Sequence, residues 1–181
     1  MRIEWVFVAG GTCRYGDRHR PVVVTDLFWT ITPLTGGQIG REELPDFPLT
    51  GLSHFEAIEL ASSLGGRLPT SVEWEWMAAG PEGRTYPWGN QDWGPTLANL
   101  LPLGVGVPVP VGSFPAGSTL EGILDVAGNV WEWTKSVVYG DGAIVRGGSY
   151  NSVPLYAHTK FLNAAPRELR SSGIGIRLVR T

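Results

Sequence analysis

Few side chains in this 181-residue chain are suited to catalysis. Sulfur chemistry would rest on Cys13 alone, because it is the one cysteine, and this excludes an intramolecular disulfide and a cysteine-rich metal site. No activating neighbour is evident, so we expect a small, inert thiol. The histidines His19, His54 and His158 lack the spacing of metal ligands, and no nucleophile elbow of a hydrolase is present. These residues by themselves indicate no recognisable catalytic chemistry.

The composition is typical of a folded chain with a modest charge. Hydrophobic residues make up 43% and charged residues 17%, and the formal net charge is −3. Because no basic stripe is present, we do not expect nucleic acid as a partner. Residues 1–10 lack the features of a signal peptide, since Glu4 interrupts a short apolar run, and no apolar stretch has membrane-spanning length. We therefore expect no membrane insertion and a cytoplasmic location.

Strand-like runs lie at both ends of the chain. Residues 3–9 and 21–32 are rich in β-branched and aromatic residues, and the polar segment 14–21 between them predicts an N-terminal hairpin. Further strand-like runs occupy residues 130–134, 143–149 and 174–179. Residues 81–122 are rich in Gly and Pro and predict irregular structure, which must be held by packing, with Trp88 and Trp93 as anchors.

Two short helices are predicted between these regions. Ser53 with Glu56, and Thr70 with Glu73, have the spacing of capping boxes at helix N-termini. The first helix has an apolar stripe of Phe55, Ile58 and Leu60 to Leu64, and the second places Trp74, Met77 and Ala78 on one face. Strands with two short helices and long loops indicate an α+β fold.

Five motifs in order resemble one family. They are Gly66-Arg67-Leu68-Pro69-Thr70-Ser71-Val72-Glu73-Trp74-Glu75-Trp76, Tyr86-Pro87-Trp88-Gly89, Leu124-Asp125-Val126-Ala127-Gly128-Asn129-Val130-Trp131-Glu132-Trp133, Arg146-Gly147-Gly148-Ser149 and Ile174-Gly175-Ile176-Arg177. Together they resemble formylglycine-generating-enzyme-like (sulfatase-modifying-factor-like) domains. The resemblance implies a C-type-lectin-like fold with two short helices, small antiparallel sheets and extensive irregular loops, and we expect one such domain over residues 1–181.

The motifs also have a structural interpretation, which we prefer. Trp131 and Trp133 should share one face of a strand and pack into the core. Gly128-Asn129 is typical of a turn. We expect buried, paired networks involving Arg67, Glu73 and Arg146.

The resemblance also argues against catalysis. The copper-dependent oxidases of the family use two cysteines after the RGGS motif, and those places are Ser152 and about Ala157 here, which cannot hold soft Cu(I). An iron-dependent branch needs a further His-rich domain, which we expect to be absent. We therefore predict no enzyme, cofactor or metal site, although Asp125, Asn129 and Asp141 are calcium ligands by type. A divergent oxidase or other enzyme of the same fold is the alternative.

Residues 150–172, between the last two motifs, show no sustained period. They could be an ordinary loop over the core, but their Tyr, Ser and Asn content is typical of a binding surface. Their position resembles the diversified region of variable proteins of diversity-generating retroelements, which display altered side chains as a ligand-binding face. The predicted ligand-binding residues are Tyr150, Asn151, Ser152, Val153, Leu155, Tyr156, His158, Phe161, Leu162, Asn163, Leu169, Ser171 and Ser172.

This resemblance implies a receptor or adhesion-type protein with an unknown macromolecular ligand, which we expect to be a protein, and an association with a phage or prophage as an alternative to the cytoplasm. A purely structural or phage-display module is a further alternative. Oligomeric state is not indicated by the sequence.

Overall fold

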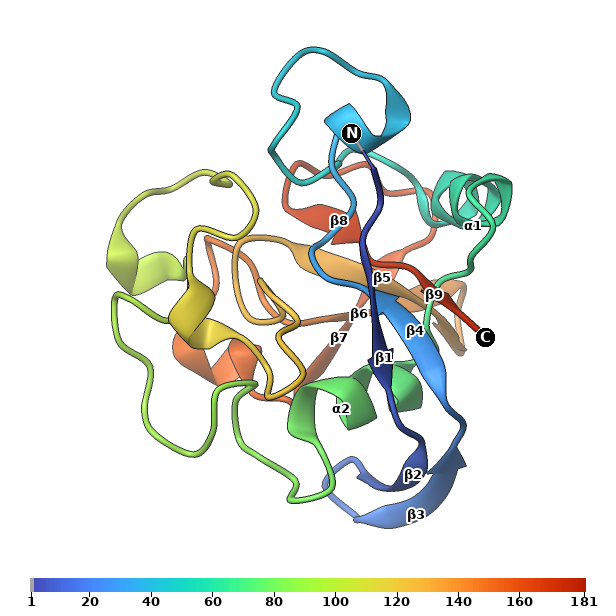
Figure 1. Cartoon of the computed structure of the whole chain (residues 1–181), viewed down its shortest axis with the longest axis vertical. Helices are drawn as coiled ribbons and strands as arrows, with labels where there is room; N and C mark the ends of the chain where they lie inside the picture. Colours follow the sequence, from blue (N-terminus) through green and yellow to red (C-terminus); the bar gives the residue numbers. More distant parts are fainter. Residues whose placement is uncertain (1) are drawn as a thin grey trace.

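The structure, a computed structural model, describes residues 2–181 as small sheets and two helices joined by long loops (Figure 1). The helices are α1 (His54–Ser63) and α2 (Ser71–Ala79). The strands are β1 (Trp5–Val8), β2 (Gly11–Tyr15), β3 (Arg20–Val24), β4 (Leu27–Thr30), β5 (Trp131–Val138), β6 (Gly142–Arg146), β7 (Leu162–Pro166), β8 (Ile174–Ile176) and β9 (Val179–Arg180). This α+β arrangement is the C-type-lectin-like fold that the motifs imply.

The sheets join the two ends of the chain. Their strand orders are β1-β4-β9, β2-β3 and β7-β6-β5-β8. Strand β9 pairs antiparallel with β4, and β8 runs parallel to β5. Neither described helix is long and apolar enough to cross a membrane.

The predicted N-terminal hairpin is present but divided in two. Strand β1 pairs with β4, and β2 pairs with β3 beyond them, so the polar turn lies where the sequence indicates. The division falls at Gly10, whose backbone N–H donates to Asp26 Oδ1 at 2.7 Å. A Cβ on Gly10 would lie 2.3 Å from the carbonyl oxygen of Val24, so the two strands approach too closely for any other residue.

Both predicted capping boxes form. Ser53 Oγ accepts from the Glu56 N–H, and Glu56 Oε2 accepts from the Ser53 N–H at 2.9 Å. Thr70 Oγ1 accepts from the Glu73 N–H, and Glu73 Oε2 accepts from the Thr70 N–H at 2.7 Å. Each box satisfies amides that a helix N-terminus leaves without partners.

The apolar stripe predicted for α1 is partly wrong. The helix buries His54, Ala57 and Ala61, whereas Phe55 and Ile58 are 39% and 36% exposed. Small residues let α1 approach the core closely, and the larger side chains remain at its edge. In α2 the predicted face of Trp74, Met77 and Ala78 is buried, and so are Glu75 and Trp76, so this helix is enclosed on nearly every side.

The long irregular stretch is held as predicted. Among the described residues 81–122, regular structure is limited to the 3-10 helices Leu101–Leu103 and Pro115–Gly117. Trp88 and Trp93 pack against a buried cluster formed by Tyr86, Ala98, Leu100, Ala127 and Ala157. The ring of Tyr86 stacks on that of Trp88 with 4.6 Å between centroids.

A buried ion pair lies where the chain ends meet the middle of the fold. Arg177 Nη2 lies 2.8 Å from Glu132 Oε1, and both side chains are fully buried. Trp74 Nε1 donates to Glu132 Oε2 at 2.7 Å. The guanidinium also donates to the carbonyls of Thr30, Ile31 and Leu124. One charged pair thus connects α2, β4, β5 and the loop before β5.

A second buried pair involves Arg146, one of the residues predicted to form paired networks. Arg146 Nη2 lies 2.8 Å from Glu75 Oε2, with both side chains buried, whereas Glu73 pairs instead with the partly exposed Arg67. Arg146 Nε also donates to Ser71 Oγ at 2.8 Å. All three predicted residues are therefore paired, but only the pair of Arg146 is fully buried, and its partner Glu75 was not predicted.

Replacing Arg177 with methionine should lower the free energy of unfolding by about 3–5 kcal/mol, because Glu132 would remain as an unpaired carboxylate in the interior. Urea denaturation followed by tryptophan fluorescence measures this loss. Arg41 is exposed and joins no ion pair in the described part of the chain, so Arg41→Met is the control and should leave the midpoint unchanged. Equal midpoints for the two variants would contradict this role of the pair.

Candidate ligand-binding surface

Residues 150–172 are ordered by contacts to their main chain. They contain a 3-10 helix, Pro154–Ala157, and strand β7, which pairs antiparallel with β6. Arg146 Nη1 donates to the carbonyls of Thr159 and Phe161, each at 3.0 Å. The Thr159 N–H donates to the carbonyl of Thr85 at 2.8 Å. These bonds hold the segment through its backbone atoms, independently of the side chains at its exposed positions.

The predicted ligand-binding residues differ in exposure. Those that are exposed are Asn151, Val153, Leu155, Tyr156, Leu162, Asn163, Leu169 and Ser172. Those that are half-buried are Tyr150, His158, Phe161 and Ser171. His158 Nε2 lies 3.0 Å from the hydroxyl oxygen of Tyr86, and burial lowers the pKa of this histidine.

Ser152 is the exception, and its prediction as a surface contact is wrong. It is only 3% exposed, and its Oγ accepts from the Ser149 N–H at 3.0 Å inside a turn. The backbone N–H of Leu101 donates to the Ser152 carbonyl. Ala157 is likewise fully buried, within the cluster around Tyr86. Both places at which the family's oxidases carry cysteines are therefore interior positions occupied by residues that cannot supply a thiolate.

Three aromatic rings form the centre of the surface. The ring centroids of Tyr156 and Phe161 are 4.7 Å apart, and Trp131 lies 6.3 Å from each. Trp131 was predicted to be core, but it is only partly buried, while Trp133 is fully buried. Alternation along β5 does not reveal this difference, because Glu132 between them is buried as well.

The aromatic cluster of Trp131, Tyr156 and Phe161 borders two hollows. One, of about 370 Å³, is lined by Trp131 together with Tyr150, Asn163 and Leu169 among others. The other, of about 700 Å³, is lined by Phe161 together with Leu155, His158 and Leu162 among others. Concave apolar surface with a few polar groups is typical of binding sites.

Towards its C-terminal end, the segment is hydrogen-bonded to the first residue of α1. The His54 N–H donates to the Arg167 carbonyl at 2.9 Å, and Arg167 Nε lies 3.2 Å from His54 Nδ1. His54 Nε2 lies 2.8 Å from the carbonyl oxygen of Thr134. A neutral ring that donates from Nε2 and accepts at Nδ1 satisfies both contacts. Burial, and after it the positive charge of Arg167, lower the pKa of His54.

The remaining residues with chemical potential do not gather at this surface. Cys13 is buried, and burial followed by the charge of Glu75 raises its pKa to about 11, so the thiol stays protonated at neutral pH. Asp125 Oδ2 accepts from the Gly112 N–H, Asn129 Oδ1 accepts from the Val109 N–H, and the exposed Asp141 pairs with Arg167. In residues 2–181 no group of three His, Cys, Asp or Glu side chains is arranged to hold a metal ion.

Comparison with known proteins agrees with the motifs. Residues 17–181 match the sulfatase-modifying factor enzyme 1-like domain. The chain belongs to this family. It is 35% identical to hercynine oxygenase of Mycobacterium tuberculosis, covering 89% of this chain but only 44% of that protein. It is 38% identical to the inactive C-alpha-formylglycine-generating enzyme 2 of Bos taurus, over 68% of this chain and 44% of the relative.

Among solved structures, Treponema denticola variable protein 1 has the same fold. Its TM-score with this chain is 0.80, at 17% identity, and the match covers 97% of this chain and 94% of the other. This chain thus shares its fold with a variable protein to which it is only 17% identical in sequence.

The stability of this family member should depend on the protonation of His54. Its folded-state pKa is lowered, so below about pH 6.5 the unfolded chain takes up a proton that the folded chain resists. The free energy of unfolding should be steady above that pH and fall as pH drops through it, by up to about 1.4 kcal/mol per pH unit. Urea denaturation across this range should show a shallower fall in His54→Gln than in the parent; equal slopes would contradict the assignment.

Exposed side chains of the segment should be replaceable together. A variant with Val153→Thr, Leu155→Asn, Leu162→Thr and Leu169→Gln should stay within about 1–2 kcal/mol of the parent, because each parent side chain is at least 40% exposed. The control is Ala157→Asp, which places an unpaired charge in the interior and should cost more than about 3 kcal/mol. Thermal unfolding compares them, and collapse of the fourfold variant would show that the segment belongs to the core.

Proposed function

We propose that this chain is a non-catalytic ligand-binding protein that presents residues 150–172 on a C-type-lectin-like scaffold spanning residues 1–181. The observation that carries the proposal is the way the segment is held. Arg146, Thr85 and strand β6 bind its backbone, while Leu155 and Tyr156 project outward. A surface of this kind accepts different side chains without loss of the fold, which is what a diversified binding face requires.

The ligand that this surface fits best is another protein. The cluster of Trp131, Tyr156 and Phe161 supplies large, rigid apolar contacts, and Asn151 and Asn163 supply exposed hydrogen-bonding groups beside it. Aromatic anchors with a polar margin are typical of protein–protein interfaces. The fold shared with a variable protein supports the same proposal, and an association with a phage or prophage is part of it.

Absence of catalysis is part of the proposal. The copper-binding cysteines of the family's oxidases correspond to the buried Ser152 and Ala157, and the thiol of Cys13 is buried elsewhere with a raised pKa. The family also contains a relative described as inactive, which is 38% identical to this chain. A chain of this fold therefore need not be an enzyme.

A divergent enzyme is the second candidate, and one observation favours it. The chain is 35% identical to a hercynine oxygenase, a closer likeness in sequence than its 17% identity to the variable protein. The chain spans 44% of the length of that oxygenase, so the match is to part of it. Because the iron-dependent branch relies on a further His-rich domain, this candidate requires catalytic groups beyond the surface described above.

Sequencing the DNA around the gene tests the proposal directly. We expect a reverse transcriptase gene and a near-copy of the codons for residues 150–172, with adenines in the copy wherever the two differ. A locus without this repeat would contradict diversification by a retroelement.

Two assays test whether the chain is an enzyme. The purified chain, incubated with copper or iron and a cysteine-containing peptide under oxygen, should give no turnover, and metal analysis should find less than about one equivalent bound. Stoichiometric metal together with oxidised peptide would favour the divergent enzyme.

A further inference from the structure

The hollow of about 700 Å³ is built from the scaffold as well as from the proposed binding segment. Gly16 and Asp17 of the turn between β2 and β3 line one part, and residues 83–85 line another. Leu155 and residues 158–162 complete it, with the side chains of Leu155, Phe161 and Leu162 providing an apolar wall. A ligand in this hollow would therefore contact both the scaffold and the exposed segment.

Arg84, in the wall of this hollow, is a buried cation without a counter-ion. It is only 7% exposed, and its Nε donates to the carbonyl of Ala79 at 3.0 Å. Its Nη2 is buried and has no hydrogen-bond partner, and no carboxylate in the described chain pairs with it. The other buried arginines, Arg146 and Arg177, are each matched with a glutamate. Because burying an unmatched guanidinium is costly, this cation is suited to an anion supplied from outside.

Glu82 approaches Arg84 without neutralising it. Its Oε2 and Arg84 Nη2 both border Gly80, each 2.8 Å from the point that a Cβ on that glycine would occupy, yet the two form no ion pair. Glu82 is exposed and Arg84 is buried. The carboxylate of Glu82 is therefore a weak internal competitor for the same cation.

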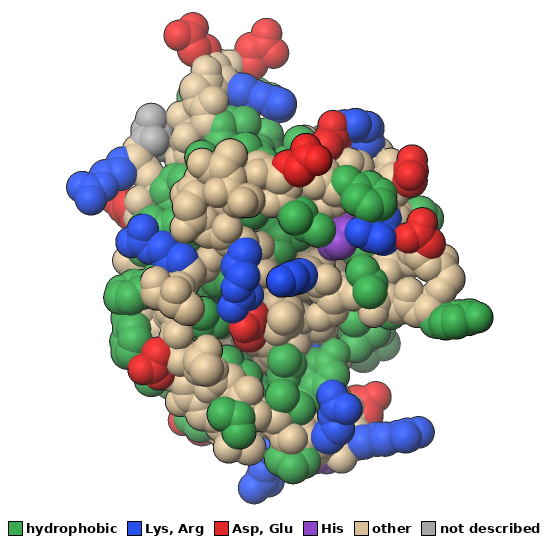
Figure 2. Space-filling view, turned by 90° about the vertical axis from the view of Figure 1, so that its right-hand side faces the viewer, with side chains coloured by type: hydrophobic (Ala, Val, Ile, Leu, Met, Phe, Trp, Pro, Cys, Tyr) green, Lys and Arg blue, Asp and Glu red, His purple; other side chains and the backbone are tan. Residues whose placement is uncertain are grey.

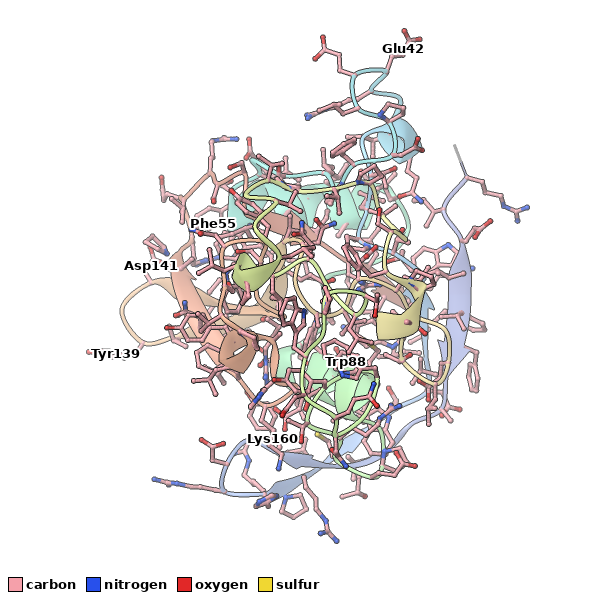
Figure 3. All side chains as sticks on the ribbon, turned by 90° about the vertical axis from the view of Figure 1, so that its left-hand side faces the viewer. Glu42, Phe55, Trp88, Tyr139, Asp141 and Lys160 are labelled. Atoms are coloured by element: carbon pink, nitrogen blue, oxygen red, sulfur yellow. The ribbon has the colours of Figure 1, made fainter. Side chains whose placement is uncertain are left out.

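A second cation lines the hollow, and the hairpin that contributes Gly16 and Asp17 to it carries others. Lys160 lines it, and its Nζ lies 3.4 Å from His19 Nδ1 in the β2–β3 turn. The same hairpin carries Arg14, Arg18 and Arg20, all exposed and without ion pairs in the described structure. Figure 2 shows Lys and Arg side chains at the lower end of the molecule, and Figure 3 places Lys160 above this hairpin.

We propose that this hollow binds an acidic segment of a protein partner, with a carboxylate against Arg84 and Lys160 and an apolar side chain against Leu155 and Phe161. The inference rests on the proposed binding function and adds the chemistry of the partner. Charge-assisted hydrogen bonds from a guanidinium to a carboxylate are strong in a partly dry site.

The test uses a defined probe. A fluorescent, terminally blocked hexapeptide with a central Phe-Leu flanked by glutamates is titrated with the full chain, and its anisotropy is measured. Two matched peptides replace the glutamates by glutamines or by lysines. We expect saturable binding of the acidic peptide alone, weakening as NaCl is raised.

Charge variants locate the peptide. Lys160→Gln should weaken binding about threefold and Glu82→Gln should strengthen it by about the same factor, since one change removes an attracting charge and the other a competing one. Arg84→Met should abolish saturable binding. The matched control is Lys135→Gln, because Lys135 is exposed on β5 and lines neither of the two hollows.

The outcomes separate this inference from the proposed function. Equal binding of all three peptides, or an affinity unchanged in both Lys160→Gln and Glu82→Gln, would overturn the acidic site while leaving the retroelement test untouched. Tighter binding of a single-stranded oligonucleotide of equal charge would assign the cations to nucleic acid instead. If the acidic peptide binds specifically but the gene has no retroelement repeat beside it, the binding site stands and only the proposed diversification is overturned.

Discussion

The geometry of this protein depends on arginines that are buried with their charges matched. Arg177 meets Glu132 where strands from both ends of the chain approach the centre, and Arg146 meets Glu75 beneath the exposed segment. Each guanidinium also donates to backbone carbonyls outside the strands and helices, such as those of Thr159, Ile31 and Leu124, which have no ladder to satisfy them. In a fold with so little helix and sheet, these guanidinium groups satisfy backbone carbonyls that would otherwise accept hydrogen bonds from other backbone N–H groups.

The surface follows from that arrangement. Since Arg146 binds the carbonyls of Thr159 and Phe161, the interior determines the path of the backbone, and side chains such as Leu155 and Tyr156 face outward. Backbone atoms therefore hold the segment in place, and its exposed side chains can differ without breaking these bonds. The same division explains why Ser152, whose hydroxyl does hold a turn, is buried whereas its neighbours Asn151 and Val153 are exposed.

Local features of the fold were predictable from sequence, and distant pairings were not. Capping boxes at Ser53 and Thr70 depend on residues three apart, so their spacing is sufficient. Strand β7 was missed because Leu162–Pro166 shows no alternation and forms by pairing with β6. The partner of Arg146 was also missed, because Glu73 and Glu75 lie on one short helix and only the packing of α2 selects between them. Trp131 was assigned to the core for a similar reason. Alternation along a strand shows which side chains share a face, but it does not show how much of that face is covered by other parts of the fold.

Attachment of the segment at two points within it has a kinetic consequence. Thr159 is bound to the loop at Thr85, and Arg167 is bound to His54 at the start of α1, so the backbone between them is already ordered before any ligand arrives. A partner would lose little conformational entropy on docking and would meet a site that does not have to reorganise. Exchange of one set of side chains for another would then alter mainly how long a complex survives, while the rate of encounter would change far less.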